Sequence, residues 1–324
     1  MSYSVDMRKQ NKVAGDKSPV VAELPAACAD ETLAVEFMER QRWGATPACP
    51  HCTSDAVYQM RGRDGERSTR FLWRCKSCEK QYTVRIGTVF EDSRIPLKHW
   101  CYGFWAACAG KKGVSALQIK RQTGLSYKSA LFMMHRIRWA MTDEFNAPLQ
   151  GTVEVDETYV GGKPRYQGLV NRGKMGRGTG RPPVVALVER GGSVRASVVP
   201  NVSGKNLKAL IRATVDRRAR IMTDDSNLYH GIGPEFDGGH ETVNHSRKEY
   251  VRGDVHTNTV EGFFSILKRG LIGTFHSVSK KHLHRYVDEF AYKYSTRHLD
   301  DGERTIIAIQ KAEGKRLTYK AQIG

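Results

Sequence analysis

The sequence lacks any long hydrophobic run. None of its apolar stretches approaches the roughly 20 residues that a membrane-spanning helix needs. Its N-terminal residues also lack the apolar core of a secretory signal peptide. We therefore expect a cytoplasmic protein that has no membrane partner.

Acidic residues are few relative to basic ones. The chain holds 34 Asp and Glu against 52 Lys and Arg, which gives a net charge of +18 and a pI near 9.7. This surplus favours a polyanionic partner such as nucleic acid. The apolar fraction of 40% is enough for a packed core, and the length of 324 residues fits about two domains.

Cysteine is scarce and odd in number, which argues against a disulfide framework. Four of the seven cysteines form two CxxC pairs that are 22 residues apart, and short apolar segments flank them. Four thiolates suit tetrahedral zinc, and four protein ligands leave no open position for chemistry. We therefore predict a zinc ribbon with a structural Zn²⁺ ion, bound by Cys49, Cys52, Cys75 and Cys78.

The segment after the cysteines favours a helix-turn-helix. An apolar helix is expected over residues 100–109, followed by a helix capped by Ser115, a turn at Gly124 and a helix capped by Ser126. We predict that this unit binds DNA, although a plain helical hairpin is the alternative. The side chains expected to face outward are Tyr127, Lys128 and either His135 or Arg136.

A second basic segment spans residues 161–183 and is rich in Gly and Arg. Its glycine content is too high for a packed element. We predict a basic loop that is either plainly exposed to solvent or lies along a phosphate backbone, with Lys174 and Arg177 as DNA contacts.

Acidic side chains mark the C-terminal half, whose strands and helices follow the order of an RNase H-like domain. Asp156 lies within an apolar strand, Asp224 ends a strand, and Glu261 lies in the first turn of a helix. A carboxylate in an apolar strand is costly unless it is paired or binds a metal. Three convergent carboxylates suit two Mg²⁺ ions acting on a phosphodiester, and Mn²⁺ can substitute. The adjacent acids, Glu154, Glu157 and Asp225, are expected beside the ligands or on the surface.

The helix that carries Glu261 has two faces. Glu261, Ser265 and Lys268 are four and seven places apart, so they lie on one face. The opposite face is apolar and comprises Phe263, Phe264, Ile266 and Leu267. Thr257 or Thr259 is expected to cap the helix and Gly270 to end it. An amphipathic surface helix without a catalytic role remains the alternative.

The motifs in this half resemble those of a known family. The stretches VEVDETYVGGK at 153–163, TD at 223–224 and HTNTVEGF at 256–263 are similar to those of DDE-type transposases of bacterial insertion sequences. The resemblance is to the family numbered fifteen ninety-five, the ISXO-like group, and covers residues from about 35 to 300. VSKKHL at 278–283 and YVDEF at 286–290 extend it.

The resemblance implies both an activity and a ligand set. It implies a transposase that binds the terminal inverted repeats of an insertion sequence, cleaves DNA strands and transfers them to target DNA. Asp156 and Asp224 are implied as metal ligands, Asn258 or Glu261 as the third ligand, and Lys268 as the lysine that follows. We prefer Glu261 because two clustered cations need negative charge.

Two other function classes remain open from sequence. One is a zinc-ribbon transcription regulator without catalysis, and the other is an RNase H-like nuclease that cuts without joining. Paired element ends favour a homo-oligomer on double-stranded DNA.

The expected organisation is a multidomain α/β chain. Its segments are a flexible leader at 1–30, a zinc ribbon at 31–95, a helix-turn-helix region at 96–147, an RNase H-like mixed-sheet catalytic domain at 148–300 and a basic C-terminal tail at 301–324.

Overall fold

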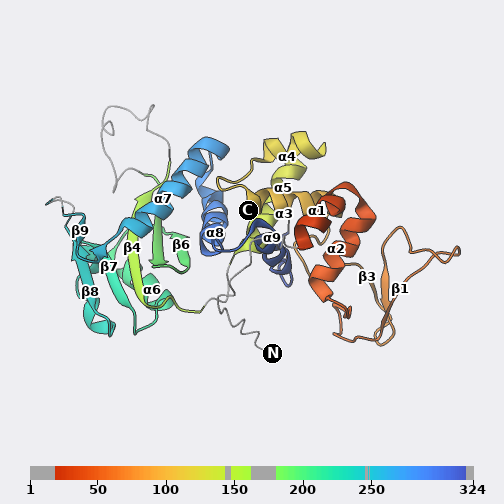
Figure 1. The fold of residues 1–324 in the computed structure, drawn as a ribbon, viewed down its shortest axis with the longest axis horizontal. Coiled ribbons are helices and arrows are strands. Elements are labelled where there is room, and N and C mark those ends of the chain that lie inside the picture. The colour runs from red at the N-terminus through yellow and green to blue at the C-terminus, as the bar shows by residue number, and fades with distance from the viewer. Residues whose placement is uncertain (1–18, 143–146, 162–179, 245–246, 248, 319–324) are drawn as a thin grey trace.

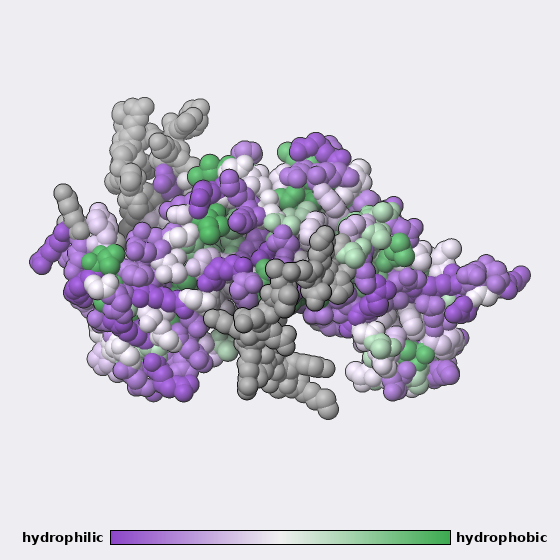
Figure 2. All heavy atoms as spheres, in the orientation of Figure 1, coloured by the Kyte–Doolittle hydropathy of each residue, from purple (hydrophilic) through white to green (hydrophobic). Residues whose placement is uncertain are grey.

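A computed structural model describes residues 19–142, 147–161, 180–244, 247 and 249–318 (Figure 1). The described elements lie along one long axis, with small strands at one end, helices in the middle and the largest sheet at the other end. No helix in these ranges is long and apolar enough to cross a membrane. Polar side chains cover most of the face in Figure 2, and apolar ones form small separate patches.

One end of the molecule is formed by a three-stranded antiparallel sheet, and five helices lie between this sheet and the rest of the protein. The strands are β1 (Val57–Gln59), β2 (Trp73–Cys75) and β3 (Gln81–Tyr82). The helices are α1 (Pro19–Ala29), α2 (Glu31–Trp43), α3 (Leu97–Ala109), α4 (Ala116–Thr123) and α5 (Tyr127–Met141). Ser115 and Ser126 cap α4 and α5 through their side chains, and Gly124 ends α4 in the left-handed conformation. The predicted caps and turn of this helix pair are confirmed.

Both ends of the chain add helices to this part, where a leader and a tail were expected. Helix α1 places Leu24 and Ala27 in the core around α3. Helix α9 (Asp301–Gln310) has a full capping box between Asp300 and Glu303 and packs on α3. Residues 301–310, expected as part of a basic C-terminal tail, instead form a helix, because their spaced apolar residues are buried against helices distant in sequence.

The second end of the molecule is a five-stranded mixed sheet in the order β6-β5-β4-β7-β8. Its strands are β4 (Thr152–Tyr159), β5 (Pro183–Glu189), β6 (Val194–Val198), β7 (Arg220–Asp224) and β8 (His240–Val243). The first three pair antiparallel, whereas β7 is parallel to both β4 and β8. A short hairpin, β9 (Val251–Arg252) and β10 (Val255–His256), follows. This order confirms the predicted RNase H-like mixed sheet.

Helices cover both faces of that sheet. Helix α6 (Gly204–Thr214) buries Leu207 and Ile211 against one face. On the other face, α7 (Asn258–Gly270) and α8 (Leu283–Ser295) share one apolar cluster with strand residues of β5 and β6. Because strand side chains alternate between faces, each residue of β4 is directed either to α6 or to α7.

Helix α7 departs from its predicted pattern at two positions. Ile266 is 37% exposed, so it does not belong to the buried face. Gly270 is the last residue of α7, as expected, but it keeps the right-handed helical conformation and the chain continues directly into a π-helical turn (Leu271–Phe275). A side chain at Gly270 would place its Cβ 2.0 Å from Phe290 Cζ, so glycine here permits α8 to approach α7 closely.

We predict that Gly270→Ala destabilises the protein by about 1–3 kcal/mol, because the added methyl group overpacks the contact with Phe290. The matched control is Gly262→Ala on the same helix, where a Cβ meets nothing within 4 Å. That control should stabilise by about 0.5–1 kcal/mol, since alanine is the better helix former. Denaturant unfolding measures both, and equal effects would disprove the packing argument.

Candidate functional site

The four cysteines of the small sheet form one compact cluster. Their Sγ atoms all lie within 4.8 Å of one another, with 3.7 Å between Cys49 and Cys78 and 3.6 Å between Cys52 and Cys75. These distances are too long for disulfides and suit four thiolates around one tetrahedral ion. Backbone N–H groups of Cys78 and Ser77 lower the pKa of the Cys75 thiol, whereas burial and contacts with the other three sulfur atoms raise the pKa of Cys52. The donor set fits structural zinc.

Aromatic rings support the cysteine cluster. Trp43, from the end of α2, packs edge-on against Trp73 and Tyr82, with ring centroids 5.8 and 5.9 Å away. These rings and the cysteines form a separate small core. So small a core needs a metal to hold it together.

The acidic residues of the large sheet converge at one edge. Asp156 lies on the central strand β4, and Asp224 is the last residue of the adjacent strand β7. The parallel register pairs Glu154 with Met222, and continuing it by two residues places Asp156 level with Asp224. Glu261 approaches from the first turn of α7, which covers this face. These are the three carboxylates that the sequence predicted as metal ligands.

Electrostatics shows that the three carboxylates are neighbours. Burial, together with the negative charges of Glu157, Asp224 and Glu261, raises the pKa of Asp156 to about 7. The N–H of Glu157 donates to Asp156 Oδ1 at 2.7 Å and opposes that rise. The mutual repulsion in a partly buried acidic cluster of this kind is relieved by a divalent cation, and its all-oxygen donors fit Mg²⁺. Among the described residues only the four cysteines gather their ligand atoms within 4.8 Å, so the carboxylates are spaced more widely.

The adjacent acids have separate contacts. Glu157 accepts a hydrogen bond from Tyr229 Oη at 2.9 Å, on the strand face opposite Asp156 as alternation predicts. Asp225 is exposed and accepts from Asn244 Nδ2 at 2.7 Å.

Glu154 holds the start of α7, a role that sequence analysis did not assign. Its side chain is fully buried, and Oε2 accepts hydrogen bonds from the N–H groups of Thr259 at 2.7 Å and Val260 at 3.1 Å. The hydroxyl of Thr259 donates to Oε1 at 2.8 Å. A carboxylate from β4 thus satisfies the free amides of the helix, in place of the predicted Thr257 or Thr259 side-chain cap.

Arg190 completes this contact. Its Nε donates to Glu154 Oε1 at 2.6 Å, its Nη1 to the Asp254 carbonyl at 2.7 Å and its Nη2 to the His256 carbonyl at 3.0 Å. The guanidinium therefore ties the hairpin before α7 to the carboxylate that caps α7. The available sequence signal was Glu154 itself, an acid two residues before Asp156 on the same strand face.

The remaining predicted residues of α7 share one exposed surface. Glu261, Ser265 and Lys268 are all exposed, which confirms that they lie on one face of the helix. Asn258 is also exposed and is the first residue of α7, three residues before Glu261.

The structure separates the predicted DNA contacts. Tyr127 is 47% exposed at the start of α5, and Lys128 follows it. Arg136 instead turns inward, where Nη1 donates to the carbonyls of Val89 at 3.1 Å and Glu91 at 2.8 Å. The outward placement predicted for Arg136 is therefore wrong.

The outward placement predicted for His135 is also wrong, because its side chain is only 3% exposed. Burial and neighbouring cations lower its pKa to about 2, so the ring is neutral. His135 packs against the rings of His282 and Tyr286, with ring centroids 4.9 and 6.1 Å away, so a segment distant in sequence buries it. Lys174 and Arg177 lie outside the described residues.

Comparison with known proteins adds two matches. Residues 148–295 match the family described as ISXO2-like transposase domain, and residues 29–81 match the transposase zinc-ribbon domain. The chain is also similar to an uncharacterized protein in transposable element ISH50 of Halobacterium salinarum. The two are 28% identical over 270 residues, which cover 80% of this chain and 89% of that relative.

We predict one zinc ion per chain, because the four sulfur atoms form a closed tetrahedral donor set. Cys49→Ser should lose that zinc and unfold the small sheet, as metal analysis and tryptophan fluorescence of Trp43 and Trp73 will report. Cys28→Ser is the control, since Cys28 lies outside the cluster, and it should keep a full equivalent of zinc. Zinc-free purified protein with an intact ribbon would contradict the assignment.

We also predict that Glu154→Gln lowers the free energy of unfolding by about 2–3 kcal/mol, because it removes charge-assisted hydrogen bonds to buried amides and to Arg190. Hydrogen exchange at Thr259 and Val260 should speed up. The control is Glu235→Gln, which loses an exposed pair with Arg212 and should leave the free energy of unfolding nearly unchanged. Similar losses for both variants would rule out the capping role.

Proposed function

Because the chain belongs to the ISXO2-like transposase family, we propose that it cleaves DNA at the ends of an insertion sequence and joins the freed 3′ hydroxyl to target DNA. The observation that carries this proposal is the convergence of Asp156, Asp224 and Glu261 at one edge of the sheet. Each comes from a different element, so the fold and not local sequence brings them together.

The three carboxylates would hold Mg²⁺, or Mn²⁺ in its place. Two such ions supply Lewis-acid stabilisation of the attacking and leaving oxygens in an in-line displacement. Asp156 and Asp224 would be ligands from rigid strands, and Glu261 the third ligand from α7. Glu154 positions Glu261 by fixing the start of α7 against β4.

The exposed residues around this edge would hold the substrate. Lys268 lies on the same face as Glu261, two turns along, where it can contact a phosphate. Tyr127 and Lys128 would contact DNA from the start of α5, and Lys174 and Arg177 from the basic loop. We further propose a homo-oligomer on paired terminal inverted repeats.

We predict that Asp156→Asn and Asp224→Asn each reduce Mg²⁺-dependent strand cleavage to background, because each removes a charged ligand. DNA binding, measured by fluorescence anisotropy, should be kept. Asp225→Asn is the matched control, since Asp225 is an exposed neighbour bonded to Asn244, and it should cleave normally. Cleavage by either ligand variant would refute the site.

A second test distinguishes strand cleavage from strand transfer, and it decides whether Glu261 or Asn258 is the third ligand. The wild type should transfer a pre-cut 3′ end into target DNA, whereas a nuclease would not. Glu261→Gln should lose cleavage in Mg²⁺ and regain part of it in Mn²⁺, while Asn258→Ala should remain largely active. An inactive Asn258→Ala beside an active Glu261→Gln would make Asn258 the ligand.

A further inference from the structure

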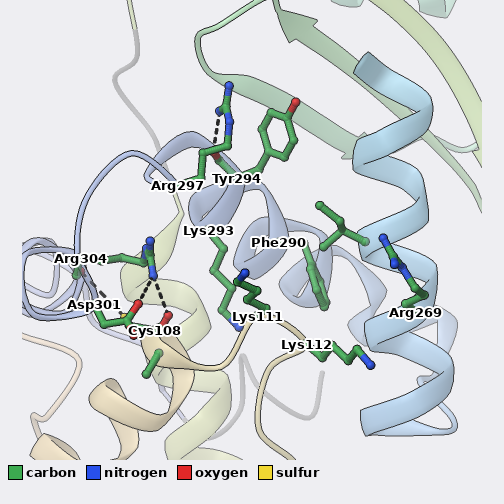
Figure 3. A pocket seen from close by; sticks show the side chains of 12 residues that line it. Cys108, Lys111, Lys112, Arg269, Phe290, Lys293, Tyr294, Arg297, Asp301 and Arg304 are labelled. Atoms are coloured by element: carbon green, nitrogen blue, oxygen red, sulfur yellow. Dashed lines mark hydrogen bonds and ion pairs between the residues drawn. The ribbon is translucent and has the colours of Figure 1, made fainter. Parts of the chain in front are cut away.

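A second concave site lies between the helical unit and the catalytic domain (Figure 3). It is a cavity of about 450 Å³, enclosed by the loop after α3 and by residues of α7, α8 and α9. One acid, Asp301, lines it. Six basic side chains line it, namely Lys111, Lys112, Arg269, Lys293, Arg297 and Arg304.

Two of these cations are already neutralised within the protein. Lys293 Nζ lies 2.6 Å from Glu289 Oε1, and Arg304 Nη1 lies 2.7 Å from Asp301 Oδ1. The carboxylate of Asp301 is therefore paired with Arg304.

The other four basic side chains are Lys111, Lys112, Arg269 and Arg297. In the part of the chain that the structure describes, no carboxylate lies within 4.0 Å of any of them. Three of the four, Lys111, Lys112 and Arg269, come from two segments far apart in sequence, and Figure 3 shows them around the ring of Phe290. The cavity therefore holds a surplus of positive charge that its own acids do not balance.

The floor of the cavity is apolar. Phe290 is 1% exposed, Ile266 borders the opening, and the guanidinium of Arg297 stacks 4.2 Å above the ring of Tyr294. Low-dielectric walls strengthen the field of nearby cations and concentrate anions there. Cations above an apolar floor suit a phosphate that is attached to a sugar.

The cavity is close to the acidic edge but does not overlap it. Arg269 follows Glu261 by eight residues on α7, which corresponds to about 12 Å along the helix. Eight residues also turn the side chain by roughly 80° around the helix. A DNA strand advances about 3.4 Å per phosphate, so this separation spans roughly three or four nucleotides.

We propose that this cavity binds backbone phosphates of double-stranded DNA, a few nucleotides from the bond at the acidic edge. The inference rests on the proposed function for that placement, but phosphate binding by the cavity can be tested without cleavage. The loop of Lys111 and Lys112 leads directly into α4 and the helix-turn-helix, whereas Arg269 belongs to α7. One duplex bound here therefore contacts the DNA-binding unit and the catalytic domain together.

The test compares two double variants of the full chain. Lys111→Gln with Arg269→Gln removes cavity charge from exposed side chains, so the fold is kept. Lys205→Gln with Arg217→Gln removes the same charge from the exposed side of α6 and its following turn, on the other face of the sheet. Thermal unfolding checks that all proteins remain folded.

Binding of a fluorescent duplex of random sequence is measured by anisotropy over a range of salt concentrations. The cavity variant should lower the slope of log affinity against log salt by about 2, because each lost phosphate contact removes roughly 0.9. The control variant should match the wild type. Equal slopes for the two variants, or a wild type without salt dependence, would overturn the inference.

Two further arms identify the ligand and separate this inference from the proposed function. Inorganic phosphate and a mononucleotide are added as competitors, and displacement of the duplex by either at low concentration would overturn binding of a polymer backbone. Strand cleavage of the same proteins is measured in Mg²⁺. If the cavity variant lowers the salt slope as expected but the wild type does not cleave DNA, the proposed function fails while the phosphate site stands.

Discussion

The buried carboxylate of Glu154 at the start of α7 is the contact on which the arrangement of the acidic edge depends. It is fully buried, yet two helix amides, a hydroxyl and the guanidinium of Arg190 satisfy its oxygens. Because Glu154 and Asp156 share one strand face, the cap fixes the distance from β4 to Glu261. Burying a charge is costly without partners, so this contact orients α7 in one way only.

A second buried ionic group joins the two halves of the molecule. Arg138 of α5 lies 2.7 Å from Glu289 of α8, which also binds Lys293 at 2.6 Å. The two cations lower the pKa of Glu289 despite its complete burial, and Arg138 stacks 4.0 Å above the ring of Tyr286. Such a group adds little net stability but disfavours other packings of α5 on α8. The helical unit of α3 to α5 and the domain of the large sheet are thereby held in one geometry, with the basic cavity between them.

Sequence patterns predicted those features of the fold that depend on residues close together in the chain. The cysteine spacing gave the zinc ribbon, serine caps and Gly124 gave α4 and α5, and alternation placed Glu157 away from Asp156. The failures all concern tertiary packing. The inward side chain of Arg136 and the glycine at Gly270 depend on neighbours from distant segments, which periodicity does not reveal.

Acidic and basic side chains have complementary roles in the proposed reaction. The acidic edge is unstable as an anionic cluster, since burial and mutual repulsion raise the pKa of Asp156 to about 7. A polyanion such as DNA would be repelled by these carboxylates alone. In the proposed reaction, the net charge of +18 and the basic cavity beside α7 would offset that repulsion, and divalent cations would remove the remainder at the reacting phosphate. In the proposed complex, the separation of the two sites along α7 would permit one strand to be held by fixed cations while its neighbouring bond faces the carboxylates.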